Sequence, residues 1–321
     1  MIKLKQILKN RLLIFLGLLA FYGIIQILLS TNILNDYYEI NIVLMGINVI
    51  LAVSLNLING FTGQFSLGHA GFMSIGAYTS AIITYKLGLP FPLAILIGGI
   101  SAGITGILIG IPSLRLKGDY LAITTLGFGE IIRVIFLNTE YVGGASGLSG
   151  IPKYTNWTWV FWIAVITVVL IKNFINSSYG RCCVAIREDE TAAESMGINT
   201  TYYKTLAFTI GAFFAGIGGA LYAHNFYIIQ PETFNFMKSF DILTMVVLGG
   251  LGSITGSILS AIFLTFVYAV LQDYAALRMV IYSLLLIVVM LFRPEGLMGT
   301  KEFSLKKLFK KGEKSSEFTV N

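Results

Sequence analysis

The feature that most constrains this chain is the recurrence of long apolar runs. Clear runs occupy residues 12–30, 40–58, 92–111, 120–138, 157–171 and 205–223, with a shorter one at 279–292. About 20 consecutive apolar residues in a helix span the hydrocarbon core of a bilayer. The sequence therefore predicts an all-α fold, a polytopic membrane helix bundle.

The composition supports a membrane protein and excludes other classes. Hydrophobic residues make up 56% of the 321 residues and charged residues only 12%, about half the usual share of a soluble domain. A cytosolic enzyme, a secreted disulfide scaffold and a nucleic-acid binder are all disfavoured. The two cysteines, Cys182 and Cys183, are adjacent, so they suit neither a disulfide nor a metal site. We expect them to carry no function.

Two further apolar stretches are interrupted by glycine. Residues 60–85 open with Gly60-Phe61-Thr62-Gly63-Gln64, and we interpret them as one span entered through a glycine-rich turn. Residues 242–271 contain glycines between 249 and 256, and we interpret them as two shorter helices around such a turn. This gives ten segments. Eight full spans plus two re-entrant segments fit almost as well, so the prediction is about 8–10 transmembrane segments.

The lysines and arginines predict the orientation. Seventeen of the 22 fall in the N-terminus, residues 112–119, residues 172–204 and the tail from residue 293, whereas the opposite loops hold four. Because basic loops stay in the cytoplasm, both termini are expected there. The run at 12–30 is longer than a signal peptide's apolar core and is interpreted as a first helix. Residues 1–300 form the predicted transmembrane domain, with a cytoplasmic loop at 172–204, and residues 301–321 form a basic cytoplasmic tail.

The glycine-interrupted stretches are the predicted pathway. Residues 59–71 show a weak sequence similarity to residues 249–260. Transporters are often built from two duplicated halves around interrupted helices, so the similarity suggests an internal repeat. The alternative is that the two glycine-rich segments resemble each other only in composition. Irregular backbone at membrane depth persists only where protein or water satisfies it. The pathway candidates are Gln64, Ser66, Gly68, His69, Gly252 and Ser253. A packing seam of small residues with a hydrogen-bonded histidine would explain them equally well.

Glu130 and Arg133 are predicted as an intramembrane charge pair. Their i, i+3 spacing in the run 120–138 lets them neutralise each other, which lowers the cost of burying both. A place in the translocation path, a contact with a partner permease and a purely structural pair are all open.

The loop at 172–204 contains a predicted helix over residues 185–197. Ala192, Ala193 and Met196 fall on one small apolar face, while Arg187, Glu190 and Glu194 fall on a charged one. Gly197 suits the position just beyond a helix end. Such a helix is suited to docking into a groove on another protein.

These residues resemble a known family. Ala192-Ala193 followed after three residues by Gly197 is similar to the cytoplasmic coupling loop of ABC importer permeases, and residues 180–222 resemble the LivM-like permease subunits of branched-chain amino acid importers. Further matching motifs are Ser66-Leu67-Gly68-His69-Ala70-Gly71-Phe72, Leu116-Lys117-Gly118-Asp119-Tyr120-Leu121-Ala122-Ile123, Thr125-Leu126-Gly127-Phe128-Gly129-Glu130-Ile131-Ile132-Arg133, Gly147-Leu148-Ser149-Gly150-Ile151-Pro152 and Arg293-Pro294-Glu295-Gly296-Leu297. Thr191 departs from the pattern, because the general motif has glutamate there.

The resemblance implies a type II ABC importer-like permease in a bacterial cytoplasmic membrane. It implies two ABC ATPase subunits, a second homologous permease and an extracytoplasmic substrate-binding protein as partners, with branched-chain amino acids as substrate. Permeases for urea or short amides belong to the same family. The residues expected to couple to the ATPases are Arg187, Glu188, Asp189, Glu190, Ala192, Ala193, Glu194 and Gly197.

No G-x-x-x-x-G-K-[ST] motif occurs in the chain. The chain is therefore expected to be a transport subunit rather than an enzyme, without a cofactor of its own, and ATP and Mg²⁺ are expected in the partner ATPases.

Two rival functions follow from the residues. An ion-coupled secondary transporter needs an unpaired intramembrane acid, and Glu130, which has Arg133 beside it, is the main candidate. An intramembrane serine protease is the remote alternative, because Ser146 and Ser149 both lie in G-x-S-G motifs. That enzyme would need a serine at the head of a helix and a histidine base such as His224.

Overall fold

The computed structural model describes residues 2–31, 35–114, 116, 118–271, 284, 287, 291–292 and 296–299, with side chains from residue 16 onward. Most of the predicted span at 279–292 and all of the tail at 301–321 lie outside these residues. The helices are α1 Ile2–Ser30, α2 Asp36–Asn56, α3 His69–Ala81, α4 Phe91–Ser113, α5 Asp119–Leu137, α6 Trp157–Asn176, α7 Ser178–Glu188, α8 Glu190–Ser195, α9 Thr200–Ala223, α10 Phe236–Gly249 and α11 Ile254–Val270.

Little other regular structure accompanies the helices. Two-residue strands β1 (Leu148–Ser149) and β2 (Ile228–Ile229) pair antiparallel. Single π-helical turns, η1 (Leu57–Phe61) and η2 (Ile82–Lys86), extend α2 and α3, and short 3₁₀ turns lie at η3 (Glu140–Val142), η4 (Gly144–Ser146) and η5 (Pro231–Phe234). The predicted all-α bundle is confirmed.

Among the residues that the structure describes, five helices are long and apolar enough to cross a bilayer. They are α2 with its π-helical extension, α4, α5, α6 and α9. By contrast α3 has 13 residues, to which η2 adds 5, and α10 has 14; at 1.5 Å per residue they reach roughly 27 Å and 21 Å, short of the roughly 30 Å core. The irregular segment before α3 lies where the glycine pattern predicts it. The turn between α10 and α11 also lies where it was predicted, at Gly250 and Gly252, both with positive φ.

Asparagine, serine and aspartate side chains mark where several helices begin. Asn156 accepts a hydrogen bond from the Trp159 amide, Asn199 from that of Tyr202, and Asn235 from that of Lys238. Each satisfies an otherwise free amide in the first turn. The cap at Asn199 explains why α9 begins at residue 200 rather than at the predicted 205, because the polar residues 200–204 form a first helical turn.

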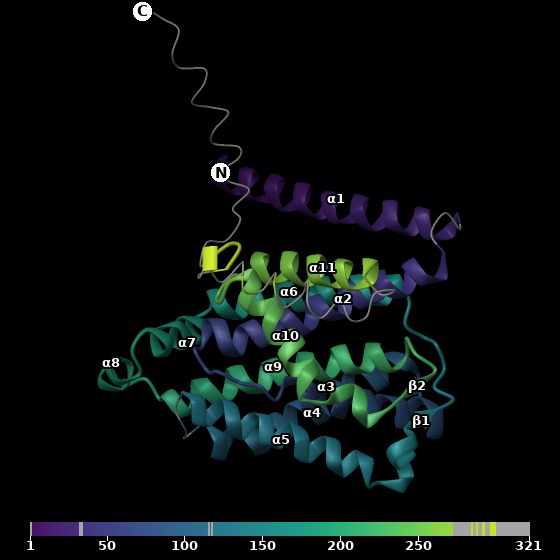
Figure 1. Ribbon diagram of the computed structural model, residues 1–321. Helices are drawn as coiled ribbons and strands as arrows, with labels where there is room; N and C mark the ends of the chain where they lie inside the picture. The colour runs from purple at the N-terminus through teal and green to yellow at the C-terminus, as the bar shows by residue number, and fades with distance from the viewer. Residues whose placement is uncertain are drawn as a thin grey trace, which may run out of the picture.

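The helices run side by side and the two ends of the bundle differ (Figure 1). Helix α9 packs against α3, α4 and α2, and α2 packs in turn against α11 and α6. Helix α1 lies at one flank, where the Tyr22 hydroxyl contacts the Thr158 hydroxyl at 3.0 Å. Helices α7 and α8 project from one end, which we call the α8 end, and β1 and β2 lie at the other, the β end.

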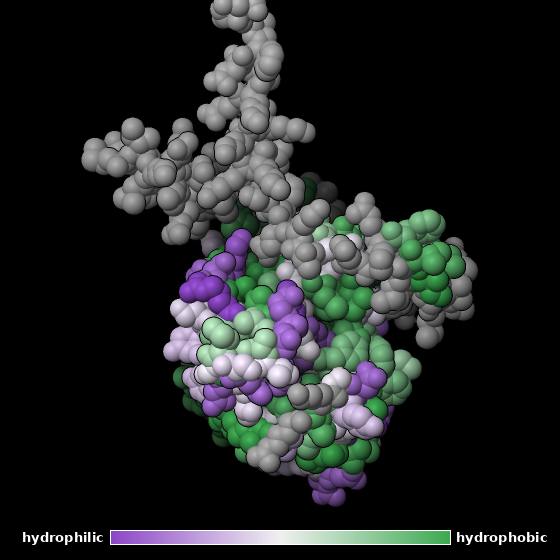
Figure 2. All heavy atoms as spheres, turned by 90° about the vertical axis from the view of Figure 1, so that its left-hand side faces the viewer, coloured by the Kyte–Doolittle hydropathy of each residue, from purple (hydrophilic) through white to green (hydrophobic). Residues whose placement is uncertain are grey.

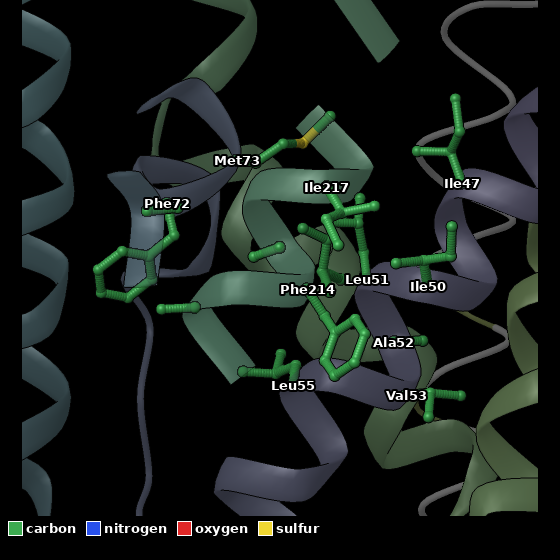
Figure 3. Packing of buried hydrophobic residues seen from close by; sticks show 14 of the residues in the cluster. Ile47, Ile50, Leu51, Ala52, Val53, Leu55, Phe72, Met73, Phe214 and Ile217 are labelled. Carbon is green, nitrogen blue, oxygen red and sulfur yellow. The ribbon is translucent and has the colours of Figure 1, made fainter. Parts of the chain in front are cut away.

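Helix α2 is the centre of the core. All of residues 47–56 are buried. Ile50, Leu51 and Leu55 are fully enclosed, and Figure 3 shows Phe214 of α9 beside the α2 side chains, with Met73 of α3 near Ile217 of α9. A helix buried on every side must be apolar all round, and α2 departs from this only at a few polar side chains considered below.

Glycine sets the spacing between α3, α4 and α9. A Cβ atom on Gly76 would lie 2.0 Å from the Gly216 carbonyl oxygen, and one on Gly219 would lie 1.9 Å from the Met73 carbonyl oxygen. These backbones are therefore in direct contact, as small residues permit in membrane helices. Membrane bundles lack a hydrophobic drive between helices, so this close packing is a main source of stability.

We expect Gly76→Ala to destabilise the protein by about 1–3 kcal/mol, because the methyl group must push α3 away from α9. The matched control is Gly127→Ala in α5, where no atom lies within 4 Å of the added carbon. That control should be neutral or stabilising by up to about 1 kcal/mol through helix propensity. Thermal unfolding in detergent measures both variants, and equal stability of the two would contradict this packing.

Candidate functional site

Residues 62–68 form an irregular segment between α2 and α3, held by protein groups. The Asn59 side chain accepts from the Ser66 amide at 3.2 Å and donates to the Ser66 carbonyl at 3.3 Å. The Leu67 amide donates to the Thr125 hydroxyl at 3.0 Å, and the Ala70 amide donates to Ser239 Oγ at 3.0 Å. The predicted glycine-rich turn before α3 is confirmed, and these bonds satisfy several of its backbone groups, as irregular backbone in a membrane protein requires.

The predicted pathway residues of this segment are buried side by side. Gln64 donates from Nε2 to the Lys204 carbonyl at 3.1 Å, and His69 Nε2 lies 2.9 Å from Ser54 Oγ in α2. Gly68 packs against the Thr125 carbonyl of α5. Gln64 Oε1 and Ser66 Oγ are buried without a hydrogen-bond partner. Buried polar atoms are usually bonded, so this stretch has unused hydrogen-bonding capacity.

The second glycine turn lies directly against the first. A Cβ atom on Gly60 would be 2.3 Å from the Gly252 amide nitrogen. Ser253 starts α11, where its hydroxyl accepts from the Gly256 amide at 3.1 Å. The two stretches that echo each other in sequence are thus neighbours in space, and the structure brings Gly252 and Ser253 next to the end of α2.

Asn56 joins the two turns, and the sequence analysis missed it. Its Oδ1 accepts from the Gly252 amide at 2.9 Å, and its Nδ2 donates to the Ser253 carbonyl at 2.9 Å and to Ser257 Oγ at 2.7 Å. The side chain is fully buried. An asparagine near the end of an apolar span was the available signal, because such a group needs partners in a membrane.

A narrow crevice separates the irregular segment from α5 and the start of α10. About 150 Å³ of space lies between its walls, open solvent at its mouth included, and the crevice is too narrow to hold a water molecule. Its lining comprises Leu67, Ala70, Gly71, Leu126, Gly129, Glu130, Phe234, Asn235, Phe236 and Ser239. The walls are mostly apolar, with Glu130, Asn235 and Ser239 as the polar groups.

Glu130 and Arg133 form the predicted pair and extend it to a third residue. Arg133 Nε lies 2.7 Å from Glu130 Oε2, and Arg133 Nη1 lies 2.9 Å from Glu232 Oε1 in η5. The second oxygen of Glu130 accepts from the Phe236 amide at 2.9 Å, at the first residue of α10. We call Glu130, Arg133 and Glu232 the α5–η5 clamp. It fixes the segment that leads into α10 over one side of the crevice.

Lys238 and Asp241 are additional charged residues that the sequence analysis left outside the spans. Both lie in the first half of α10, which begins six residues earlier than the predicted apolar run at 242. Asp241 Oδ1 accepts from the Tyr268 hydroxyl of α11 at 3.2 Å. Asp241 therefore joins Glu130 as a partnered acidic residue on a helix of the bundle, with Lys238 as its i, i+3 neighbour.

The predicted single helix over residues 185–197 is wrong, because the chain breaks at Asp189. That residue has an extended backbone, φ −155° and ψ 110°, and its carboxylate caps α8 by accepting from the Ala192 amide at 3.0 Å. Aspartate in this sequence acts as a helix N-cap rather than as part of a charged face. The predicted stop at Gly197 is correct: φ is +81°, and the amides of Gly197 and Ile198 bond to the carbonyls of Glu194 and Ala193.

The predicted apolar face of this segment is also wrong in detail. Ala193 is buried, whereas Ala192 is exposed and Met196 is 83% exposed. The carboxylates of α8 are engaged within the chain. Glu190 bonds Lys204 at 2.6 Å, and Glu194 accepts from the Thr200 hydroxyl at 2.7 Å. These two bonds hold α8 against the start of α9 and leave its opposite side open.

Of the residues predicted to couple to the ATPases, Arg187 in α7 contacts the helix bundle. Arg187 donates from Nη1 to the Gly60 carbonyl at 2.9 Å and pairs with the exposed Glu188.

Burial of Cys183 raises the pKa of its thiol to about 11, so this cysteine stays protonated and is a poor nucleophile. Figure 2 looks onto the α8 end and shows hydrophilic residues gathered there between apolar flanks.

The geometry does not support a serine nucleophile. Ser146 ends the 3₁₀ turn η4 and Ser149 lies in β1, so neither heads an α-helix. His224 Nε2 lies 2.7 Å from Thr84 Oγ1, and its Nδ1 lies 2.8 Å from the Ala220 carbonyl. Both ring nitrogens are therefore occupied by groups of the fold rather than directed at either serine.

We expect Asn56→Leu to destabilise the protein by at least about 2 kcal/mol, because the buried Gly252 amide loses its acceptor and each unmet buried group costs about 1–3 kcal/mol. Asn176→Ala is the control, since that exposed side chain bonds only to the Lys172 carbonyl one turn back, and it should change stability by no more than about 0.5 kcal/mol. Thermal unfolding measures the stability, and protease cleavage near residue 251 should become faster in Asn56→Leu. Unchanged cleavage in that variant would argue that Asn56 does not hold the two turns together.

Comparison with known proteins identifies the family. Residues 37–292 match the family described as branched-chain amino acid transport system / permease component. The chain is 38% identical to the LivM permease protein of a high-affinity branched-chain amino acid transport system from Escherichia coli, over 84% of this chain and 72% of that protein. It is 31% identical to the LivH permease protein of E. coli, over 57% of this chain and 60% of that protein.

A solved structure, PsaBC from Streptococcus pneumoniae in complex with Fab, aligns with a TM-score of 0.45 and 14% identity, over 83% of this chain and 94% of that one. The family assignment comes instead from the match across residues 37–292 and from the identity to LivM. The chain therefore belongs to the family of branched-chain amino acid transport permease components.

Proposed function

We propose that this chain is the transmembrane permease subunit of an ATP-driven importer for branched-chain amino acids. The observation that carries the proposal is the pair α7–α8, which projects from an apolar bundle and displays Met196 at 83% exposure. An exposed methionine beside small residues suits a groove on a partner protein. Membership of the permease family identifies the class of transport.

In this proposal the α8 end faces the cytoplasm and the β end faces outward. The support is the excess of lysine and arginine in the segments assigned to the α8 end. Two ATPase subunits, which bind ATP and Mg²⁺, dock on α8. A second homologous permease completes the membrane unit, and a substrate-binding protein docks at the β end.

The proposed pathway runs between the two glycine turns and the crevice beneath η5. Gln64 Oε1 and Ser66 Oγ supply polar atoms without protein partners, which suit contact with substrate or water in another conformation. In the present conformation the α5–η5 clamp draws the start of α10 against α5 at the crevice. For alternating access, the clamp responds to the binding protein and the α8 end responds to the ATPases. Both partners then shift the same equilibrium between the inward-open and outward-open states.

The test of the function is purification in mild detergent followed by reconstitution of the isolated complex. A co-purifying ATPase and second permease, with ATP-dependent uptake of leucine, isoleucine or valine into proteoliposomes, are expected. Uptake of urea or short amides instead would keep the mechanism and change the substrate. Uptake that survives ATP depletion and collapses with an ionophore would replace the proposal with ion-coupled transport, for which Asp241 and Glu130 would be the acids to test.

The docking role of α8 predicts the effect of one substitution. Met196→Glu should reduce ATP-dependent uptake at least about tenfold and weaken ATPase retention, because it places a charge in an apolar contact, at a cost of roughly 1–3 kcal/mol. Met196→Leu keeps the size and apolarity and should remain within about twofold of the native rate. Both variants should reach the membrane at native levels, since the side chain is 83% exposed. Full ATPase retention by Met196→Glu would move the docking surface elsewhere.

A further inference from the structure

Arg187 occupies the place where the α8 end meets both glycine turns. Its Nη1 donates to the Gly60 carbonyl at 2.9 Å, and its Nε donates to Glu188 at 3.1 Å. A Cβ atom on Gly252 would lie 2.9 Å from the same Nη1. The guanidinium thus touches the end of α2–η1 and the α10–α11 turn at once. The side chain is 27% exposed, so it lies mostly within the protein.

The glycines at this place have a geometric role. Gly63 has φ +70°, and a Cβ atom there would lie 2.9 Å from Arg187 Cγ. Gly252 has φ +86°. Both conformations favour glycine, and the missing side chains leave room for the arginine stem and head. The two interrupted segments and the arginine are therefore fitted to one another.

Charge reinforces the contact. The Gly60 carbonyl lies in the final π-helical turn of α2–η1, where carbonyl groups lack partners within the helix and carry partial negative charge. A guanidinium is permanently charged and donates in a fixed planar geometry. Hydrogen bonds of this charge-assisted kind are roughly twice as strong as neutral ones. The contact between α7 and the membrane segments is thus stronger than an ordinary surface hydrogen bond.

Helix α7 is connected to α8 through Asp189 alone. A force on α8 reaches the bundle through α7 and through the bonds of Glu190 and Glu194 to α9. Of these contacts, Arg187 is the one that reaches both glycine turns, which border the proposed pathway.

We propose that Arg187 is a positioning residue that transmits movement of α7–α8 to the two glycine turns, rather than a residue that binds the ATPase. The inference rests on the proposed function and deepens it. Because the guanidinium holds Gly60 and abuts Gly252, both turns move with α7 as one unit.

The experiment measures ATP hydrolysed and substrate transported by the reconstituted complex of permeases, ATPases and binding protein. Arg187→Ala should lower substrate moved per ATP at least about fivefold, the lower end of coupling between linked sites, while the ATPase stays bound. Arg187→Lys, which can still donate to the Gly60 carbonyl, should recover part of the ratio. Arg181→Ala is the matched control, because that arginine bonds only to Asn176 and Ser178 nearby, and its ratio should remain native.

The outcomes separate this inference from the proposed function. A native complex without ATP-driven uptake would refute the function itself. A working native complex with an unchanged ratio in Arg187→Ala would overturn the inference alone, as would loss of the bound ATPase, which would make Arg187 a docking residue. If Arg187→Ala fails to accumulate, the result for Arg187→Lys decides the question. A native ratio of substrate moved per ATP, with native stability, in Arg187→Lys would show that the contact of the planar guanidinium with both glycine turns is dispensable.

A covalent substitute provides the second measurement. A Cβ atom on Gly63 would lie 3.4 Å from Arg187 Cβ, close to the separation found in disulfides. In a background with Cys182 and Cys183 replaced by alanine, Gly63→Cys with Arg187→Cys should couple poorly when reduced and recover when oxidised. Gly63→Cys alone should show no redox dependence. Oxidation that abolishes transport would mean that the contact must open during the cycle, and the rigid transmission proposed here would be wrong.

Discussion

The need to satisfy backbone groups inside a membrane is the constraint on which the rest of this structure depends. The chain is irregular between η1 and α3 and between α10 and α11, and each irregular segment leaves amides and carbonyls that lipid cannot bond. Asn56 and Asn59, one turn apart at the end of α2, supply those bonds, Asn59 to residue 66 and Asn56 to residues 252–253. The irregular segments persist because a buried helix carries their partners.

Glycine serves two opposite purposes in the bundle. Between α3 and α9, Gly76 and Gly216 allow straight helices to touch along their backbones, which makes that region rigid. At Gly63 and Gly252, positive φ lets the chain turn back on itself. The close-packed region therefore provides a fixed frame, and the turns beside it provide the places where the frame can be rearranged.

Much of the architecture could be predicted from apolar periodicity and glycine. The spans, the interruption before His69 and the turn at Gly250–Gly252 follow from the residues alone. The helix break at Asp189 could not be predicted, because an aspartate is equally compatible with a charged helix face and with a helix N-cap until the flanking backbone is known. Glu232 and Asn56 act across more than 95 residues of chain, and such partnerships carry no local pattern. Asp241 was missed because α10 begins at a capping asparagine before its apolar run.

Helix α8 is closed at both ends by bonds of its own segment, the Asp189 cap at its start and the left-handed Gly197 at its end. Its inward side is attached to α9 through Glu190 and Glu194. The outward side chains take no part in these attachments, apart from the bond of the Ser195 hydroxyl to the Thr191 carbonyl. They are Thr191, Ala192, Ser195 and Met196. Evolution can therefore vary those four side chains to match a different docking partner while the membrane portion stays the same, so specificity of assembly can diverge independently of the transport pathway.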